Sequence, residues 1–418
     1  MATLTLNDLY KRLIKAAAED KTQEELEKIM KGEYDAHGLE CLLNPKKHAP
    51  VWQAAPCDCK EDECASIAAC IFNAIKRDEN GNFDIDIDAC VGCHACIDAC
   101  ELGKLTESKD ILAVLNALKY SKGPVYAMIA PAFIGQFSPE VTPGMLRSAF
   151  KKIGFQGMVE VALFADILTL KEALEYDRII HEQKDFVLTS CCCPVWIAMI
   201  RKVYPEFLPH LPGSVSPMVA CGRSIKRLEP GAVTVFIGPC IAKKAEAREE
   251  DIADAVDYVL TFQEMRDIFE AFHIDLTKME DDPRDHSSLA GRIYARTGGV
   301  SEAVKKTVER LCLKDAIPVR ATHADGVPAC RALLNSLKEG KVDANFLEGM
   351  GCIGGCVGGP KAVLDRDKGR DNVNRYGEQA LYETPVDNPY VLELLKQLGY
   401  KTVESLLDEN SMFSRRIK

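Results

Sequence analysis

Four cysteines between residues 90 and 100 constrain this chain more than any other feature of its sequence. They follow the pattern C-x2-C-x2-C-x3-C, and eight of the 18 cysteines of the chain lie between residues 57 and 100. Spacing this short lets several thiolates reach one metal cluster from a single loop. Of the eight histidines only His94 falls within a cysteine group, so an iron–sulfur cluster suits this segment better than zinc. The sequence therefore predicts a segment folded around iron–sulfur clusters.

The run resembles that of bacterial two-cluster ferredoxins, in which the fourth cysteine serves the other cluster. Glu101 stands where such a run usually has proline, and the earlier cysteines are less regularly spaced. On the ferredoxin pattern, one [4Fe–4S] cluster is held by Cys70, Cys90, Cys93 and Cys96, and the other by Cys57, Cys59, Cys64 and Cys100. The irregular spacing leaves open that Cys41 replaces Cys57 or Cys59. Residues 78–82 predict a hairpin turn between the two halves, and we expect residues 51–115 to form a ferredoxin-like α+β domain.

The rest of the chain is divided into three parts by its hydrophobic pattern. Residues 1–50 are rich in helix-type periodicity, and residues 386–418 contain a closing helix over 391–398. Residues 116–385 alternate apolar strand patterns with amphipathic helices, which predicts an α/β domain with mixed sheets flanked by helices and a site between two lobes. The expected strands are 125–130, 186–188, 233–237, 256–260, 317–322 and a short alternating segment at 342–346. The expected helices are 143–152, 167–181 and 263–272.

Size and charge exclude several classes of protein. The 418 residues are enough for two or three domains with a large core. The net charge of −11 and a pI near 5.4 make nucleic acid an unsuitable partner. The first residues show no secretory signal, and no uncharged run reaches the roughly 18 residues that span a bilayer. We therefore expect a cytoplasmic protein that does not bind a membrane.

Three further segments carry cysteines in unusual settings. Residues 189–196 read Thr-Ser-Cys-Cys-Cys-Pro-Val-Trp, and residues 238–246 read Gly-Pro-Cys-Ile-Ala-Lys-Lys-Ala-Glu. Residues 346–360 place two cysteines four apart among glycines, which let a backbone approach a bulky object closely. Together the three segments resemble the site motifs of the iron-only ([FeFe]) hydrogenases, over roughly residues 50–380.

The resemblance implies a set of ligands for the H-cluster, which is a [4Fe–4S] cubane joined to a two-iron subsite with CO, cyanide and azadithiolate. The implied cubane ligands are Cys193, Cys240, Cys352 and Cys356, of which Cys356 also bridges to the two-iron subsite. Residues implied to line or hold the subsite are Pro131, Ala132, Lys243, Glu246 and Met350. An ammonium such as that of Lys243 donates to a cyanide and compensates its charge; a solvated lysine at a helix start is the plainer alternative.

The resemblance also implies a route for protons. Cys192 corresponds to the thiol that passes protons to the subsite, although the extra cysteine leaves either Cys191 or Cys192 as the donor. Glu172 and Glu175 correspond to carboxylates of the family's proton channel, with a solvated acidic helix face as the alternative. A serine of the usual path aligns with Pro212, which has no hydroxyl. Gly238 replaces a methionine beside the subsite, so the chain belongs to a divergent subgroup.

Three functions follow from this resemblance. The first is a hydrogenase that reversibly interconverts protons and electrons with dihydrogen. A ferredoxin-type carrier would exchange the electrons, and hydrogenase maturases would deliver the two-iron subsite. The second is a sensor that binds dihydrogen but turns over slowly. The third is a non-enzymatic iron–sulfur assembly protein without the two-iron subsite, which the joint presence of Cys192, Lys243, Glu246 and Met350 argues against. The oligomeric state is not determined by the sequence.

Overall fold

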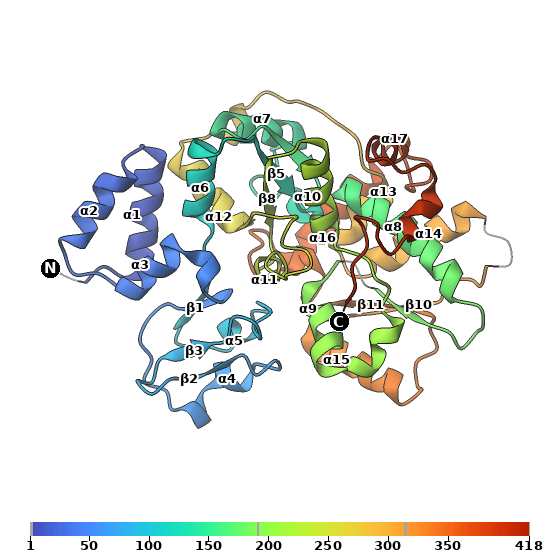
Figure 1. The fold of residues 1–418 in the computed structure, drawn as a ribbon, viewed down its shortest axis with the longest axis horizontal. Helices are drawn as coiled ribbons and strands as arrows, with labels where there is room; N and C mark the ends of the chain where they lie inside the picture. Colours follow the sequence, from blue (N-terminus) through green and yellow to red (C-terminus); the bar gives the residue numbers. More distant parts are fainter. Residues whose placement is uncertain (1–2, 190–191, 313–315, 418) are drawn as a thin grey trace.

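The computed structural model describes residues 3–189, 192–312 and 316–417. A four-stranded sheet stands near the centre of the molecule, with a smaller sheet on one side and a cysteine-rich unit on the other (Figure 1). The expected α/β class, with sheets flanked by helices, is confirmed. Every strand pair in the two larger sheets is parallel, however, so these sheets are not mixed in strand direction.

The central sheet has the order β6-β5-β8-β9. Its strands are β5 (Val125–Ile129), β6 (Gly157–Glu160), β8 (Val233–Gly238) and β9 (Tyr258–Thr261). Most of the side chains of β5 and β8 are buried, as expected of parallel strands covered on both faces. The helices that pack against these strands are α6 (Ile111–Tyr120), α7 (Pro143–Ile153), α10 (Pro217–Leu228) and α12 (Phe262–Ala271).

The smaller sheet has the order β10-β11-β7, with β10 at Ala321–Asp325, β11 at Phe346–Met350 and β7 at Val187–Leu188. The helices α9 (Pro194–Val203), α14 (Gly299–Leu311) and α15 (Val327–Lys338) pack against it. Helix α8 (Ala162–Ile179) follows β6 of the central sheet and packs on α10, α13 (Leu289–Arg292) and α14. Since α8 is buried on nearly all sides, it joins the two lobes of the domain.

Two of the expected strands lie further along the chain than predicted. The structure places β10 at 321–325 instead of 317–322, because the carbonyl oxygens of Ile317 and Pro318 accept hydrogen bonds from the Tyr176 hydroxyl. It also places β11 at 346–350 instead of 342–346, so the strand runs into the third cysteine motif. The helix predicted at 167–181 begins five residues earlier, as α8, and the other predicted strands and helices shift by only one or two residues at their ends.

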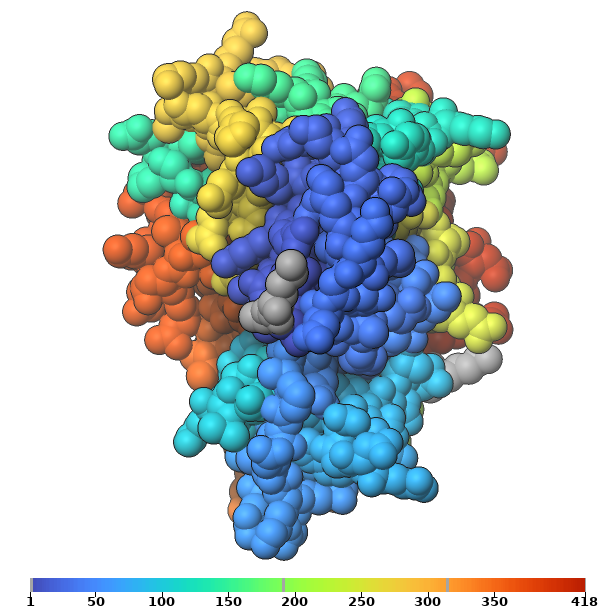
Figure 2. All heavy atoms as spheres, turned by 90° about the vertical axis from the view of Figure 1, so that its left-hand side faces the viewer, coloured from blue at the N-terminus to red at the C-terminus, as the bar shows by residue number. Residues whose placement is uncertain are grey.

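The cysteine-rich unit follows the N-terminal helices in the chain and lies below them in Figure 1. Its strands form two antiparallel pairs, β1 (Val51–Gln53) with β4 (Leu105–Glu107) and β2 (Ile75–Arg77) with β3 (Phe83–Ile85). Asp78 closes the predicted turn by accepting hydrogen bonds from the backbone N–H groups of Asn80 and Asn82 at 2.9 and 2.8 Å. Figure 2 shows this unit at the bottom of the molecule, below the N-terminal helices.

The unit contains an internal repeat of thirty residues, which relates 65–77 to 95–107. Helix α4 (Ala65–Ala68) corresponds to α5 (Ala95–Asp98), and strand β2 corresponds to β4. After each helix comes a cysteine whose Sγ accepts a 3.3 Å hydrogen bond from the N–H four residues later, Cys70 from Ala74 and Cys100 from Lys104. The residue before each donor has a positive φ, 53° at Asn73 and 61° at Gly103. The two halves are therefore alike in backbone as well as in sequence.

The ends of the chain pack on the two-lobed domain. Helices α1 (Leu6–Ala18), α2 (Thr22–Met30) and α3 (Ala36–Leu43) form the N-terminal segment, and α1 packs on α6 and α12. Helix α6 runs across the expected domain boundary at residue 115, and the last strand of the cysteine-rich unit ends at Glu107. After α16 (Arg366–Glu378) and α17 (Pro389–Gln397), the C-terminal segment pairs with residues 213–215 through the N–H of Val215 and the carbonyl of Phe413, 3.0 Å apart.

Candidate active site

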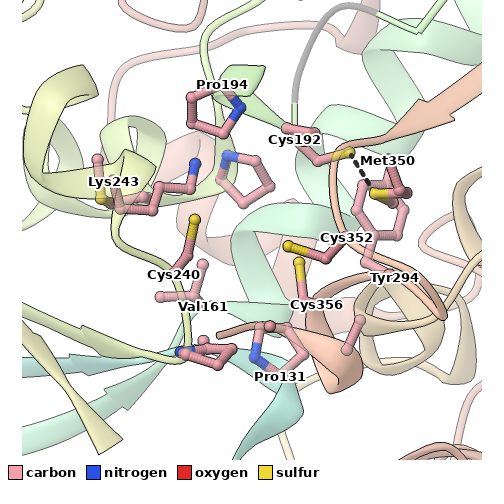
Figure 3. A pocket seen from close by; sticks show the side chains of 18 of the residues that line it. Pro131, Val161, Cys192, Pro194, Cys240, Lys243, Tyr294, Met350, Cys352 and Cys356 are labelled. Carbon is pink, nitrogen blue, oxygen red and sulfur yellow. Dashed lines mark hydrogen bonds between the residues drawn. The ribbon is translucent and has the colours of Figure 1, made fainter. Parts of the chain in front are cut away.

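A cavity lies where the carboxyl ends of the two parallel sheets face each other (Figure 3). Pro131 follows β5 and Cys240 follows β8, while Cys352 follows β11 of the other sheet. Carboxyl ends of parallel strands are the usual place for a site in such folds. The cavity has a volume of about 70 Å³, measured as the space that the centre of a water molecule could occupy. The structure thus brings all three cysteine motifs of the sequence to one place.

Four of the thiols belong to the predicted cubane ligands, and all of them line this cavity. They are Cys193, Cys240, Cys352 and Cys356. Burial, together with the neighbouring thiols of Cys192 and Cys240, raises the pKa of the Cys193 thiol to about 12. The pKa values of Cys352 and Cys356 are raised by burial and by the other cavity thiols. These four sulfur atoms therefore lie close enough to interact electrostatically, out of contact with bulk water.

Glycines let the third motif approach the other two. A Cβ atom at Gly349 would lie 2.1 Å from the Trp196 ring, and one at Gly355 would lie 2.7 Å from the backbone nitrogen of Thr297. The N–H of Gly351 donates a 3.2 Å hydrogen bond to Cys193 Sγ, which stabilises a thiolate at that position. The glycine-rich composition of this motif thus follows from close packing against the first motif.

Cys192 and Met350 also face the cavity. Their sulfur atoms lie 4.0 Å apart, and both side chains are among those that line it (Figure 3). Cys191, the alternative proton donor of the sequence analysis, lies outside the described residues. The structure therefore offers Cys192 as a thiol that is adjacent to the predicted cubane ligand Cys193 and lines the same cavity.

Lys243 supplies a positive charge to the cavity. Its ammonium donates a 2.6 Å hydrogen bond to Glu246 Oε2, and both side chains are buried. Burial by itself lowers the pKa of Lys243, but the carboxylate of Glu246 outweighs this effect and the pKa is raised. The side chain of Lys243 lines the cavity, whereas Glu246 faces a separate surface groove. The plainer reading of Lys243 as a solvated lysine is not supported by its burial.

Two of the predicted lining residues differ in their placement. Pro131 lines the cavity, but Ala132 is completely buried next to it and is not among the lining residues of the described chain. Tyr294 and Val161, which the sequence analysis did not single out, do line the cavity. Both belong to segments without cysteines, so nothing in the sequence pattern identified them.

Glu172 and Glu175 are buried on α8 and do not line the cavity in the described part of the chain. Glu175 forms an ion pair with Lys171, which is also buried, and accepts a 3.1 Å hydrogen bond from the Ser214 hydroxyl. The ammonium of Lys171 donates to the same hydroxyl at 2.9 Å. Burial of both carboxylates contradicts the alternative of a solvated acidic face. Ser214 places a hydroxyl beside Glu175, and sequence reasoning missed it because it lies two residues beyond the position that aligns with the family's serine.

The cysteine-rich unit contains two groups of thiols. Cys70, Cys90, Cys93 and Cys96 line one small cavity together, which is the set predicted from the ferredoxin pattern. In the other group, Arg77 donates hydrogen bonds to the Sγ atoms of Cys57 and Cys64, and Cys57 and Cys59 also interact with each other. Ser66 is buried at the repeat position of Cys96, which explains why the first half takes its thiols from the preceding loop. Cys41 lies elsewhere, on α3 beside His37, so it does not replace Cys57 or Cys59.

The cysteine-rich unit touches the active-site cavity through Gly92. A Cβ atom there would lie 3.1 Å from the carbonyl oxygen of Ile241 and 3.2 Å from the backbone of Ala242, the two residues after Cys240. Cys93 lies close enough to Cys352 to raise the pKa of its thiol. The second thiol group of the unit and the thiols of the cavity are therefore neighbours.

The sequence profile of the iron-only hydrogenase large subunit, C-terminal domain, matches residues 123–360. The chain belongs to this family. It is 29% identical over 328 residues to iron hydrogenase 1 of Clostridium pasteurianum, a match that covers 66% of this chain and 57% of that protein. It is also 25% identical to the cytosolic iron–sulfur assembly component 3 of Pongo abelii, over 74% of this chain and 79% of the relative. The divergence expected from the motifs is consistent with relatives of both kinds.

Solved structures of the family share the fold. An apo [FeFe]-hydrogenase from Chlamydomonas reinhardtii superposes with a TM-score of 0.58 at 20% identity, and the match covers 70% of this chain and 97% of that one. Family membership supports iron–sulfur cluster binding by this chain. The donor set fits such a cofactor, since four thiols and an ammonium line one cavity. In the part of the chain that is described, no three His, Cys, Asp or Glu side chains are arranged to hold a single metal ion. None of the described helices is long and apolar enough to cross a membrane.

Proposed function

We propose that the chain is an [FeFe] hydrogenase that interconverts protons and electrons with dihydrogen at an H-cluster. The observation that carries this proposal is the convergence of Cys192, the four cubane thiols and Lys243 on one buried cavity. The bound H-cluster supplies the redox chemistry of dihydrogen. The protein supplies ligands, charge compensation, a dry cavity and a proton donor.

The cavity residues have distinct roles in this proposal. The four predicted thiolates would hold the cubane, and Cys356 would also serve the two-iron subsite. Lys243, whose ammonium is oriented by Glu246 at 2.6 Å, would donate a hydrogen bond to a cyanide of the subsite. Met350 and Pro131 cover the subsite and exclude water. Cys192 holds a proton on Sγ at the edge of the cavity.

Protons reach Cys192 through Glu172 and Glu175. Ser214 takes the place of the missing hydroxyl at Pro212, because it donates directly to Glu175. Lys171 is an additional cation in this buried chain of polar groups, and it forms an ion pair with Glu175.

Cys57, Cys59, Cys64 and Cys100 would hold one [4Fe–4S] cluster, and Cys70, Cys90, Cys93 and Cys96 would hold the other; the two clusters would supply electron relay. The contact between Gly92 and Ile241 joins the second group of thiols to the segment of Cys240. A ferredoxin-type carrier donates or accepts the electrons, and hydrogenase maturases install the two-iron subsite. The protein works in the cytoplasm. The chain spans 57% of the length of its Clostridium relative.

The assembly-component relatives favour a second candidate, a protein that binds iron–sulfur clusters without the two-iron subsite. Infrared spectroscopy separates the two. After anaerobic maturation, a hydrogenase shows carbonyl and cyanide stretching bands that shift under dihydrogen. Cys221→Ala is a matched control, because this thiol is fully buried on α10 away from the cavity. The infrared bands of the matured Cys221→Ala variant should equal those of the wild type. Matured protein that contains iron and sulfide but lacks these bands would contradict the proposal. Bands with very slow turnover would instead support the sensor.

A further inference from the structure

Arg77 occupies a special position in the thirty-residue repeat of the cysteine-rich unit. It is the last residue of β2, and its counterpart at the end of β4 is Glu107. The two halves therefore carry opposite charges at the same structural position. Glu107 points to Lys109 and Lys361, whereas Arg77 points to the thiols of its own half.

The guanidinium of Arg77 is held from several sides. It donates to Cys57 Sγ at 3.2 Å and lies 3.9 Å from Cys64 Sγ. Its other terminal nitrogen donates to the carbonyl of Gly81 at 2.8 Å, and the group stacks 3.8 Å above the ring of Phe83. The hairpin of β2 and β3 thus fixes a permanent positive charge directly beside two predicted cluster ligands.

The remainder of the unit is strongly acidic. Its exposed carboxylates are Asp58, Glu61, Asp62, Glu63, Asp78, Glu79, Asp84, Asp86, Asp88, Asp98 and Glu101. Because these side chains are in water, their fields are screened by solvent and salt. A half-buried guanidinium in hydrogen-bond contact with sulfur is screened much less, so its effect on a cluster exceeds that of any single surface carboxylate.

Reduction of a [4Fe–4S] cluster adds one electron and breaks no bond, so the charge on cluster and thiolates becomes more negative. A fixed cation and an N–H···S hydrogen bond stabilise this more negative state. We propose that Arg77 raises the reduction potential of the cluster held by Cys57, Cys59, Cys64 and Cys100, and thereby makes that cluster the acceptor of electrons from an external carrier. The proposal rests on the two ferredoxin-type clusters of the proposed function and does not require the two-iron subsite.

The test is a potentiometric titration of the full-length chain, reconstituted with iron and sulfide and followed by electron paramagnetic resonance. Dithionite is the reductant, and the signal that Cys57→Ser alters marks the first cluster. In Arg77→Gln we expect the midpoint potential of the first cluster to fall. At the wild-type midpoint potential, the ratio of reduced to oxidised first cluster should drop at least tenfold, which corresponds to a shift of about 59 mV for a one-electron couple. The midpoint of the second cluster should not change, and Arg77→Lys should restore part of the shift.

Lys76→Gln is the matched control. Lys76 is the neighbouring residue on β2, is exposed, and pairs with Asp84 at 3.3 Å, so its removal changes the net charge equally without touching a thiol. An equal shift in Lys76→Gln and Arg77→Gln, or no shift in Arg77→Gln, would overturn the proposal. Arg77→Met is a second neutral variant in case the first binds iron poorly. Loss of the first cluster from both neutral variants, seen as missing iron, would also overturn it, because Arg77 would then be a structural residue. Absence of the two-iron subsite would refute only the hydrogenase function.

Discussion

Glu107 and Lys361 join the cysteine-rich unit to the segment that follows the third cysteine motif. Their carboxylate oxygen and ammonium nitrogen lie 2.7 Å apart, and Glu107 is almost fully buried. Lys361 also donates its backbone N–H to the carbonyl of Pro239, beside Cys240. One ion pair therefore links the proposed electron-transfer unit to two of the active-site motifs.

This pair should make stability depend on pH. Burial opposes ionisation of Glu107, but Lys109 and Lys361 outweigh burial and lower its pKa to about 2. The folded-state pKa lies below the roughly 4.3 of a free glutamate, so the carboxylate contributes about 3 kcal/mol above pH 5 and loses this as the pH falls toward 2. Urea unfolding of the cluster-free chain should show Glu107→Gln less stable than the wild type at pH 7, with the difference shrinking at pH 3.5. A difference that is constant with pH would contradict this assignment.

Replacement of Gly92 by alanine tests the contact between the two cluster-binding regions. Gly92 has φ +66°, and a Cβ atom would press on Ile241 and Ala242. Gly103 is the matched control, because it has φ +61° in the same unit but nothing within 4 Å of its Cβ position. In both variants an alanine with positive φ lowers the free energy of unfolding by about 1 kcal/mol. Only Gly92→Ala should slow the transfer of electrons to the cubane, measured by freeze-quench spectroscopy. Equal rates in the two variants would show that this contact is not on the electron route.

Cys192 and Cys193 are adjacent but should differ in function. Cys192→Ala should retain the wild-type iron content and lose at least about 100-fold in hydrogen turnover, because general acid–base catalysis typically contributes 10²–10⁴-fold. Cys193→Ala should lose iron from the cubane, since it removes a ligand. Iron analysis and hydrogen evolution measure the two effects. Normal turnover in Cys192→Ala would contradict Cys192 as the proton donor and would favour Cys191 in its place.

Ser214 is expected to relay protons. In Ser214→Ala the hydroxyl between Lys171 and Glu175 is removed while their ion pair stays, so folding should lose only about 1 kcal/mol. Hydrogen turnover should fall at least tenfold with unchanged infrared bands. Ser224→Ala is a suitable control, because this buried hydroxyl donates only to the carbonyl of Ala220 within α10. Unchanged turnover in Ser214→Ala would exclude a path through this hydroxyl.

The sequence identified the residues with distinctive chemistry better than the polar groups that support them. Cysteine spacing predicted the thiols that share a cavity, such as Cys90 with Cys93, because ligand spacing is local and short. Lys171 and Ser214 were missed because they are 43 residues apart and meet only when α8 packs beside the segment before α10. Strand β10 was misplaced because Tyr176, far away in sequence, takes the carbonyls that an earlier strand would need. Such long-range hydrogen bonds leave no periodic signal.

The thirty-residue repeat also affects the direction in which electrons would move between two centres held by the same backbone. Two copies of one backbone, each with a cysteine bonded at 3.3 Å to the N–H four residues on, would give their centres equal environments. The divergence at Arg77 and Glu107 places a cation beside the thiols of one copy and joins the other copy to Lys361. A substitution at one repeat position can then change electron transfer at one of the two centres. The shared backbone and electron transfer at the other centre stay unchanged.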